Sequence, residues 1–127
     1  MARYVLAFDL GTGGSRASLY DEKGECVGSV FEAVRTRYSR SEFHEQRPQS
    51  WWDAVTLSSR TLLDMAGQVN QVTPQEVVAI AIGGHSLGTV PLDAEGNLLL
   101  EWTPIWSDGR GLKQAEDYFH IMSYEQW

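Results

Sequence analysis

The chain has 127 residues, of which 43% are hydrophobic and 21% are charged, and this composition predicts a globular domain rather than a disordered tail. Its formal net charge is −7 and it has no basic run, which argues against a nucleic-acid-binding surface. No apolar stretch approaches the roughly 20 residues that cross a bilayer, and the short apolar start lacks the features of a secretory signal, so we expect a cytoplasmic protein without membrane contact.

The chain starts with a predicted strand, a glycine loop and a β-hairpin. Residues 4–8 are apolar and end at Asp9, a pattern typical of a buried strand that leads into a tight turn. Residues 17–20 and 26–31 flank a polar turn and predict the two strands of the hairpin. Cys26 lies in the second of these strands and is the only cysteine, which excludes a disulfide within the chain.

A polar connection and a long helix are predicted next. Residues 35–47 carry mixed charge without periodicity and predict an extended connection over the surface. Pro48 suits the first turn of a helix, and apolar residues then recur at spacings of three and four up to Ala66. We therefore predict a helix over 48–66, with Gly67 as its C-cap.

The second half of the chain predicts a central strand, a second hairpin and a helix. Residues 77–82 are continuously apolar, which suits a strand that is covered on both faces. Residues 89–92 and 98–100 flank a turn and predict a hairpin. Residues 112–127 show apolar positions at helical spacing without a signal that ends the helix. The predicted fold class is α/β, with a mixed β-sheet and flanking helices.

The first glycine loop has groups suited to a metal-bound polyphosphate. Glycines let the main chain approach anionic oxygens with its N–H groups, and Asp9 is placed to hold Mg²⁺ directly or through its waters. An ordinary glycine turn is the alternative interpretation. A P-loop is excluded because its Gly-Lys signature is absent, and a dinucleotide fingerprint because strands rather than a helix follow. The candidate phosphate-binding residues are Gly11, Thr12, Gly13, Gly14 and Arg16.

The strand, the Asp-x-Gly-Thr loop and the hairpin resemble the first phosphate loop of the actin, Hsp70 and sugar-kinase superfamily. Residues 45–52 (EQRPQSWW) and 106–110 (WSDGR) resemble segments of the FGGY carbohydrate kinases, xylulokinases in particular. The resemblance implies an actin-like (ribonuclease H-like) fold, and transfer of the ATP γ-phosphoryl group to a sugar or polyol hydroxyl with Mg²⁺. It further implies that residues 1–127 are the N-terminal portion of the first actin-like domain.

In that family a second domain, an aspartate base, a second phosphate loop and an adenosine pocket complete the enzyme. The resemblance implies that all four lie outside this chain. We therefore expect the chain by itself to be inactive as a kinase. We also expect it to self-associate, because missing sheet partners would leave apolar surface exposed.

The second glycine loop contains the candidate substrate residues. The resemblance implies that His85, Ser86 and Leu87 lie in the sugar-contacting loop, where xylulokinases have Gln, Met and His, so xylulose is not carried over as the substrate. It places Asp108 and Arg110 at the sugar cleft. A solvated turn is the alternative for His85 and Ser86, and a local ion pair in an Asp-Gly turn is the alternative for Asp108 and Arg110.

Two rival functions are consistent with parts of the sequence. Residues 84–88 also match the Gly-x-Ser-x-Gly elbow of serine esterases, with Ser86, Asp108 and His120 in the esterase order, but strands are predicted where that elbow needs a helix. A non-catalytic nucleotide-binding or interaction domain of the same fold is the other rival.

Core positions are expected for three tryptophans: Trp51, Trp52 and Trp106.

Overall fold

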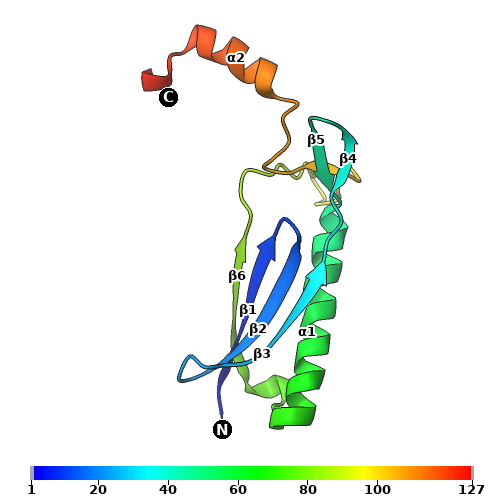
Figure 1. Cartoon of the computed structure of the whole chain (residues 1–127), viewed down its shortest axis with the longest axis vertical. Coiled ribbons are helices and arrows are strands. Elements are labelled where there is room, and N and C mark those ends of the chain that lie inside the picture. The colour runs from blue at the N-terminus through cyan, green and yellow to red at the C-terminus, as the bar shows by residue number, and fades with distance from the viewer. Residues whose placement is uncertain (1, 127) are drawn as a thin grey trace.

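The structure is a computed structural model that describes residues 2–126. Its elements in chain order are β1 (Tyr4–Gly11), β2 (Gly14–Asp21), β3 (Cys26–Ala33), β4 (Arg37–Arg40), β5 (Phe43–Gln46), α1 (Pro48–Asn70), η1 (Pro74–Glu76), β6 (Val77–Gly84), β7 (Thr103–Pro104), α2 (Leu112–Ile121) and η2 (Tyr124–Gln126). Four strands form the main sheet, in the order β3-β2-β1-β6, and three form the small sheet, in the order β4-β5-β7 (Figure 1).

The main sheet and α1 form the core. Strand β1 runs antiparallel to β2 and parallel to β6, and α1 lies along β2 and β3 (Figure 1). Alternate residues of β1 and β2 face this helix, so that Leu6 lies opposite Leu19 and Phe8 opposite Ala17. Leu62 of α1 completes the cluster at 1% exposure. Burying a leucine of this kind stabilises the fold by roughly 2 kcal/mol. The predicted first strand and the hairpin are confirmed as β1, β2 and β3.

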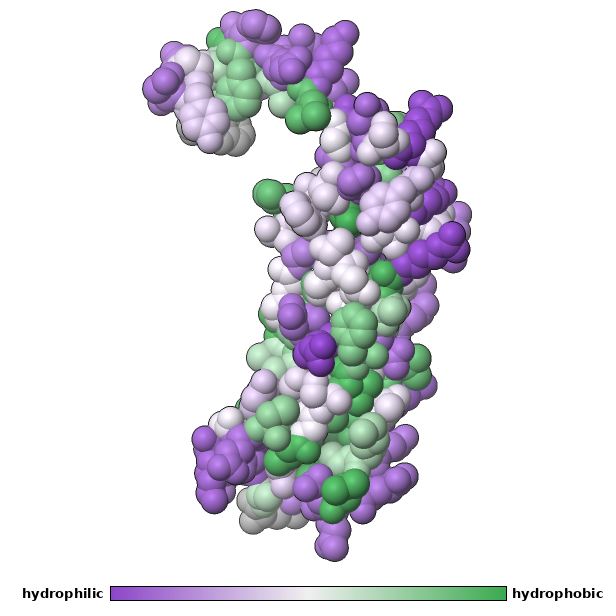
Figure 2. All heavy atoms as spheres, in the orientation of Figure 1, coloured by the Kyte–Doolittle hydropathy of each residue, from purple (hydrophilic) through white to green (hydrophobic). Residues whose placement is uncertain are grey.

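The predicted strand 77–82 forms as β6, but it is not covered on both faces. Strand β6 is an edge of the main sheet, and α1 packs against β2 and β3 at the other side. Ile80 and Ile82 are consequently 64% and 66% exposed. An apolar groove of about 320 Å³ separates β6 from α1, with Trp52 on its helix side. Figure 2 shows many apolar residues on the visible face of the main sheet and α1, and mostly polar residues around the small sheet above them.

Residues 35–47 were predicted as an extended connection, and this prediction is wrong for most of their length. They form β4 and β5, which pair antiparallel, and β5 then pairs with β7. Glu45 lies opposite Pro104, and Gln46 lies opposite Thr103. Both strands have only four residues, and β5 meets its second partner almost 60 residues further along, so local sequence patterns carry little of the signal.

Helix α1 begins at Pro48 as predicted and runs past Gly67 to Asn70. The residue that caps its C-terminus is Gln71, which is left-handed with a φ of 58°. Gly67 serves a different purpose, because a Cβ there would lie 3.3 Å from the carbonyl oxygen of Val72, where the chain turns back across the helix. The glycine permits close approach of the backbone rather than ending the helix.

The last third of the chain departs further from the expected elements. The predicted hairpin at 89–92 and 98–100 is reduced to a single bridge between Leu92 and Leu98. Helix α2 ends at Ile121, before the short η2, and residue 127 lies outside the described residues. Figure 1 shows α2 standing away from both sheets. Within residues 2–126, no helix has both the length and the apolarity needed to cross a membrane.

Candidate functional site

The first glycine loop is a tight turn between β1 and β2. Gly11 pairs with Gly14, and Thr12 and Gly13 form the tip of the turn. Gly14 has a φ of 153°, and a Cβ there would collide with the carbonyl oxygen of Glu32. Glycine is therefore required at position 14, because the tip of the hairpin is pressed against β3.

The acceptor groups at the tip are held by protein donors. The Gln46 side chain donates from Nε2 to the carbonyl oxygen of Thr12 at 2.6 Å, and the Val34 N–H donates to the carbonyl oxygen of Gly13 at 3.0 Å. The Trp106 indole N–H donates to Thr12 Oγ1 at 2.8 Å. The backbone N–H groups of Thr12 and Gly13 make no hydrogen bond within residues 2–126. Adjacent free N–H groups on a fixed turn are suited to binding an anion.

Asp9 and Arg16 lie beside this tip on the opposite face from α1. They are direct cross-strand partners, and the Arg16 guanidinium lies 5.5 Å from the ring centre of Phe31. Asp9 is exposed and has no ion pair in the described part of the chain, and its neighbour on β6 is Gly83, which has no side chain to crowd it. No cluster of three metal-binding side chains occurs among the described residues. One free carboxylate beside an anion site fits Mg²⁺, which is usually held by one or two carboxylates together with substrate phosphates.

The second glycine loop follows β6 and lies next to the first glycine loop. Leu10 pairs with Gly84 in parallel register, and the His85 N–H donates to the Leu10 carbonyl oxygen at 3.0 Å. A pocket of about 190 Å³ opens here, lined by Leu10, Trp51 and the loop that includes Ser86 and Leu87. Because β1 and β6 are parallel neighbours, their carboxyl ends bring the two glycine loops to the same edge of the main sheet.

The His85 side chain borders this pocket and has unused polar atoms. It packs edge-on against Trp51, with 5.4 Å between ring centres and an interplanar angle of 79°. Both ring nitrogens are buried and have no hydrogen-bond partner in the structure of residues 2–126. A buried polar atom without a partner is costly, so these nitrogens are suited to a ligand hydroxyl. Leu87 has a φ of 63°, a conformation uncommon for leucine, and its side chain is 85% exposed.

Asp108 and Arg110 are fixed by ion pairs. Arg110 donates to both carboxylate oxygens of Asp108 at 2.7 Å and to Glu45 at 2.7 Å, while the His44 N–H donates to Asp108 at 2.9 Å. Arg37 contacts the other oxygen of Glu45. These bonds tie the 106–110 segment to β5. The ion pair between Asp108 and Arg110 matches the alternative interpretation that the sequence analysis left open for these two residues.

The same contacts set the pKa values in this cluster. The Arg110 hydrogen bonds are the largest influence on Asp108 and lower its pKa, against the effect of burial. Burial acts to raise the pKa of Glu45, but the hydrogen bonds and charges of Arg110 and Arg37 outweigh it and lower the pKa. The bond to Asp108 raises the pKa of Arg110 still further above neutral. The three side chains are therefore all charged at neutral pH.

Residues 4–125 match the model of the N-terminal domain of the FGGY family of carbohydrate kinases. The chain belongs to this family. It is 31% identical to a glycerol kinase of Natranaerobius thermophilus over 92% of this chain and 23% of that protein. It is 32% identical to the xylulose kinase of Escherichia coli over 83% of this chain and 20% of that protein. The chain thus spans about a fifth of the length of the curated relatives it matches.

Solved structures show the actin-like fold of the sugar kinases. The gluconate kinase of Lactobacillus acidophilus superposes with a TM-score of 0.82 at 21% identity, over 95% of this chain and 23% of that one. The xylulose kinase of Rhodospirillum rubrum gives 0.82 at 22% identity, over 97% of this chain and 25% of that one. The predicted family and fold class are confirmed by these matches.

The esterase alternative does not fit this FGGY domain. No helix follows Ser86, since the next helix in the described residues is α2. Ser86 makes no hydrogen bond to Asp108 or His120 within that part of the chain, and Asp108 is instead bound to Arg110. The elbow geometry that activates a serine is therefore absent from residues 2–126.

Sequence reasoning missed the residues that support the glycine hairpin. Gln46 is fully buried, and its bond to Thr12 depends on a contact between residues 34 positions apart in the chain. Trp106 was expected in the core, but it is 54% exposed and bonds to Thr12. Trp52 is also outside the core, at 64% exposure. The signal available in the sequence was that Gln46 and Trp106 lie in the two segments that resemble the family.

Proposed function

We propose that the complete protein transfers the γ-phosphoryl group of ATP to a hydroxyl of a sugar or polyol. In this proposal the chain supplies the first phosphate hairpin and part of the substrate pocket. The main support is the adjacency of the two glycine loops, joined by the bond from the His85 N–H to the Leu10 carbonyl oxygen. One loop offers free N–H groups to an anion, and the other borders a pocket with unpaired ring nitrogens.

On the phosphate side, we assign the hairpin from Gly11 to Gly14 to the phosphate oxygens of ATP. The free N–H groups of Thr12 and Gly13 bind these oxygens, and Arg16 contributes positive charge from β2. The Thr12 hydroxyl accepts a bond from Trp106 and keeps its own proton for donation. Mg²⁺, held by Asp9, would neutralise phosphate charge. Phosphoryl transfer depends mainly on such positioning and charge stabilisation.

On the substrate side, we assign the pocket at His85, Ser86 and Leu87 to the sugar or polyol. The His85 nitrogens and the Ser86 hydroxyl are suited to substrate hydroxyls. Asp108 and Arg110 are assigned to the border of the same cleft, where their ion pair keeps the 106–110 segment in place. The general base and the remaining ATP contacts are assigned to parts of the protein beyond this chain.

A coupled assay of ADP release tests the proposal. The complete gene product that contains residues 1–127 is incubated with Mg·ATP and a panel of pentoses, ketoses, sugar acids and polyols, with glycerol, gluconate and xylulose included. We expect turnover that depends on one class of acceptor. ADP release that does not respond to any acceptor would reject the carbohydrate-kinase assignment.

A further inference from the structure

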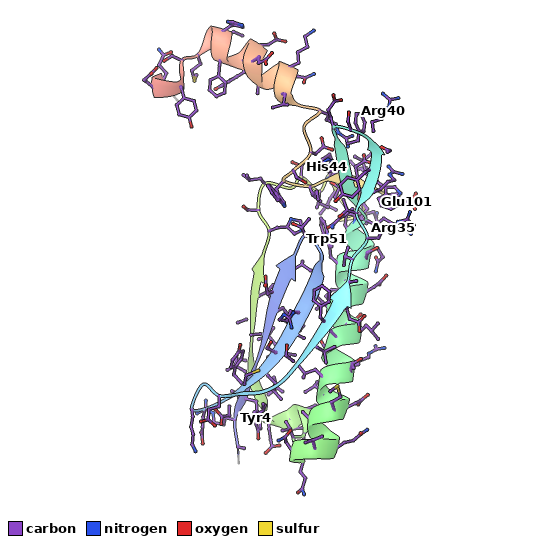
Figure 3. The ribbon with its side chains drawn as sticks, in the orientation of Figure 1. Tyr4, Arg35, Arg40, His44, Trp51 and Glu101 are labelled. Atoms are coloured by element: carbon purple, nitrogen blue, oxygen red, sulfur yellow. The ribbon has the colours of Figure 1, made fainter. Side chains whose placement is uncertain are left out.

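We propose that Gln46 is a positioning residue that joins the phosphate hairpin to the substrate pocket through Trp51. This inference rests on the proposed function and assigns a role to a side chain that binds neither substrate. Gln46 is fully buried at the end of β5, immediately before α1. Figure 3 shows Trp51 between the start of α1 and the turn that joins β1 to β2.

The bonds of Gln46 leave its amide only one orientation. Trp51 Nε1 can only donate, and it lies 2.7 Å from Gln46 Oε1. The Thr12 carbonyl oxygen can only accept, and it lies 2.6 Å from Gln46 Nε2. The second hydrogen of Nε2 is directed to Thr36 Oγ1 at 2.8 Å. A flipped amide would place a donor against the Trp51 N–H and an acceptor against the Thr12 carbonyl oxygen, so only one orientation satisfies both partners.

Trp51 carries the connection to the substrate side. Its ring packs edge-on against His85 and lines the pocket of the second glycine loop. Thr12 and His85 are thus linked through two groups, the buried Gln46 amide and the half-buried Trp51 indole. Displacement of either group would shift the tip of the hairpin or the wall of the pocket, while the main sheet would stay in place.

Two substitutions separate the two ends of this link. Gln46→Glu keeps an acceptor for Trp51 but places a carboxylate oxygen against the Thr12 carbonyl, so we expect loss on the phosphate side only. Gln46→Met keeps the length of the side chain but breaks all three bonds, to Thr12, Thr36 and Trp51, so we expect loss on both sides. Leaving one buried polar group without its partner corresponds to roughly a 10- to 100-fold effect.

The first measurement requires no substrate. The Val34 N–H bonds to the Gly13 carbonyl oxygen, so its hydrogen exchange reports whether the hairpin tip is held against β3. We expect exchange at Val34 to rise about 10-fold or more in Gln46→Glu and Gln46→Met, with Leu19 in the main sheet still protected. Unchanged exchange at Val34, or equal loss of protection at Leu19, would overturn the positioning role whether or not the protein is a kinase.

The second measurement uses the complete gene product with Mg·ATP and its active acceptor. We expect Gln46→Glu to raise the KM for Mg·ATP or lower kcat by roughly 10- to 100-fold while the KM for the acceptor stays near wild type. Gln46→Met should raise both KM values. Gln68→Glu, which adds the same charge at an exposed site of α1, controls for simple repulsion and should behave as wild type.

The result that would overturn the link is a Gln46→Glu enzyme with wild-type kinetics, or one that loses affinity for both substrates equally. If Gln46→Glu does not fold, Trp51→Phe tests the same link from its other end. That variant removes the bond to Gln46 Oε1, and we expect faster exchange at Val34 together with a raised acceptor KM. Wild-type exchange in Trp51→Phe would contradict the proposal. An inactive wild-type enzyme would instead count against the proposed function.

Discussion

At the scale of single residues, the phosphate hairpin depends on which hydrogen-bonding groups are occupied. The carbonyl oxygens of Thr12 and Gly13 are bound by Gln46 and Val34, whereas the N–H groups at the tip are free. In a turn whose carbonyl oxygens and N–H groups were all exposed, the peptide groups could reorient to bind water. Here the protein occupies the acceptors, so the donors are held outward and can bind an anion with little further ordering.

Asp9→Asn tests the magnesium assignment at this scale. The substitution keeps the shape of the side chain and removes the charge, so we expect turnover of the complete gene product to fall roughly 10²- to 10³-fold, by analogy with loss of one oxyanion donor. The KM for the acceptor should hardly change, because the substrate pocket is built by a separate loop. Kinetics and thermal unfolding of the variant are the measurements.

Asp64→Asn, the same change at an exposed site on α1, is the matched control and should leave turnover unchanged. A wild-type rate in Asp9→Asn would remove Asp9 from the metal site. A large fall in the melting temperature together with loss of acceptor binding would make Asp9 a structural residue, and the phosphate-loop assignment would fail with it.

At the scale of elements, the small sheet is held to the 106–110 segment by charge. Glu45 lies between Arg37 and Arg110, and Arg110 also binds Asp108. The folded pKa values of Glu45 and Asp108 are below their ordinary values. A lowered pKa contributes stability that is complete above the unfolded pKa, near 4, and that is lost as the pH falls through the folded pKa.

Glu45→Gln should therefore lower stability at neutral pH by roughly 1–3 kcal/mol, because two arginines lose a charged acceptor. It should also flatten the decline in stability between about pH 5 and pH 3, since one of the groups that produces this decline is gone. Urea unfolding at pH 7, 5 and 3 measures both effects. Glu22→Gln in the exposed hairpin turn is the control, and an equal loss in both variants would contradict the assigned role of the ion pairs.

Elements with a local cause were predictable from the sequence. The apolar run before Asp9, the turn at Gly24 and the start of α1 at Pro48 all formed where the pattern indicated. The small sheet was not predictable, because β5 is completed by β7 through a contact made far along the chain. The apolar strand β6 was identified, but its sequence does not say which elements cover it.

The candidate site follows the same division. Glycine, aspartate and arginine around the first turn pointed to a phosphate loop, and the structure places the second glycine loop beside it. The supports of that turn, Gln46 and Trp106, come from distant segments and could be found only from the fold. Local chemistry suggested the groups that we propose bind ligands, whereas long-range packing determines which groups support them.

At the scale of the whole molecule, the open side of the main sheet predicts self-association of the 127-residue chain. Val78, Ile80 and Ile82 are 51%, 64% and 66% exposed on the edge strand β6. Exposed edges with apolar side chains favour pairing with another chain. We expect sedimentation velocity to show a concentration-dependent rise in mass. Ile80→Lys should reduce that rise, and a monomer at all concentrations in the unsubstituted chain would contradict the prediction.

The most direct test of the central claim is identification of the product. The complete gene product is incubated with Mg·ATP and the acceptor that gives ADP release, and the reaction is followed by phosphorus NMR. We predict a phosphate monoester of the acceptor that appears in equal amount with ADP, with no product from the 127-residue chain alone. Inorganic phosphate in place of the ester would show an ATPase rather than a carbohydrate kinase and would contradict the account.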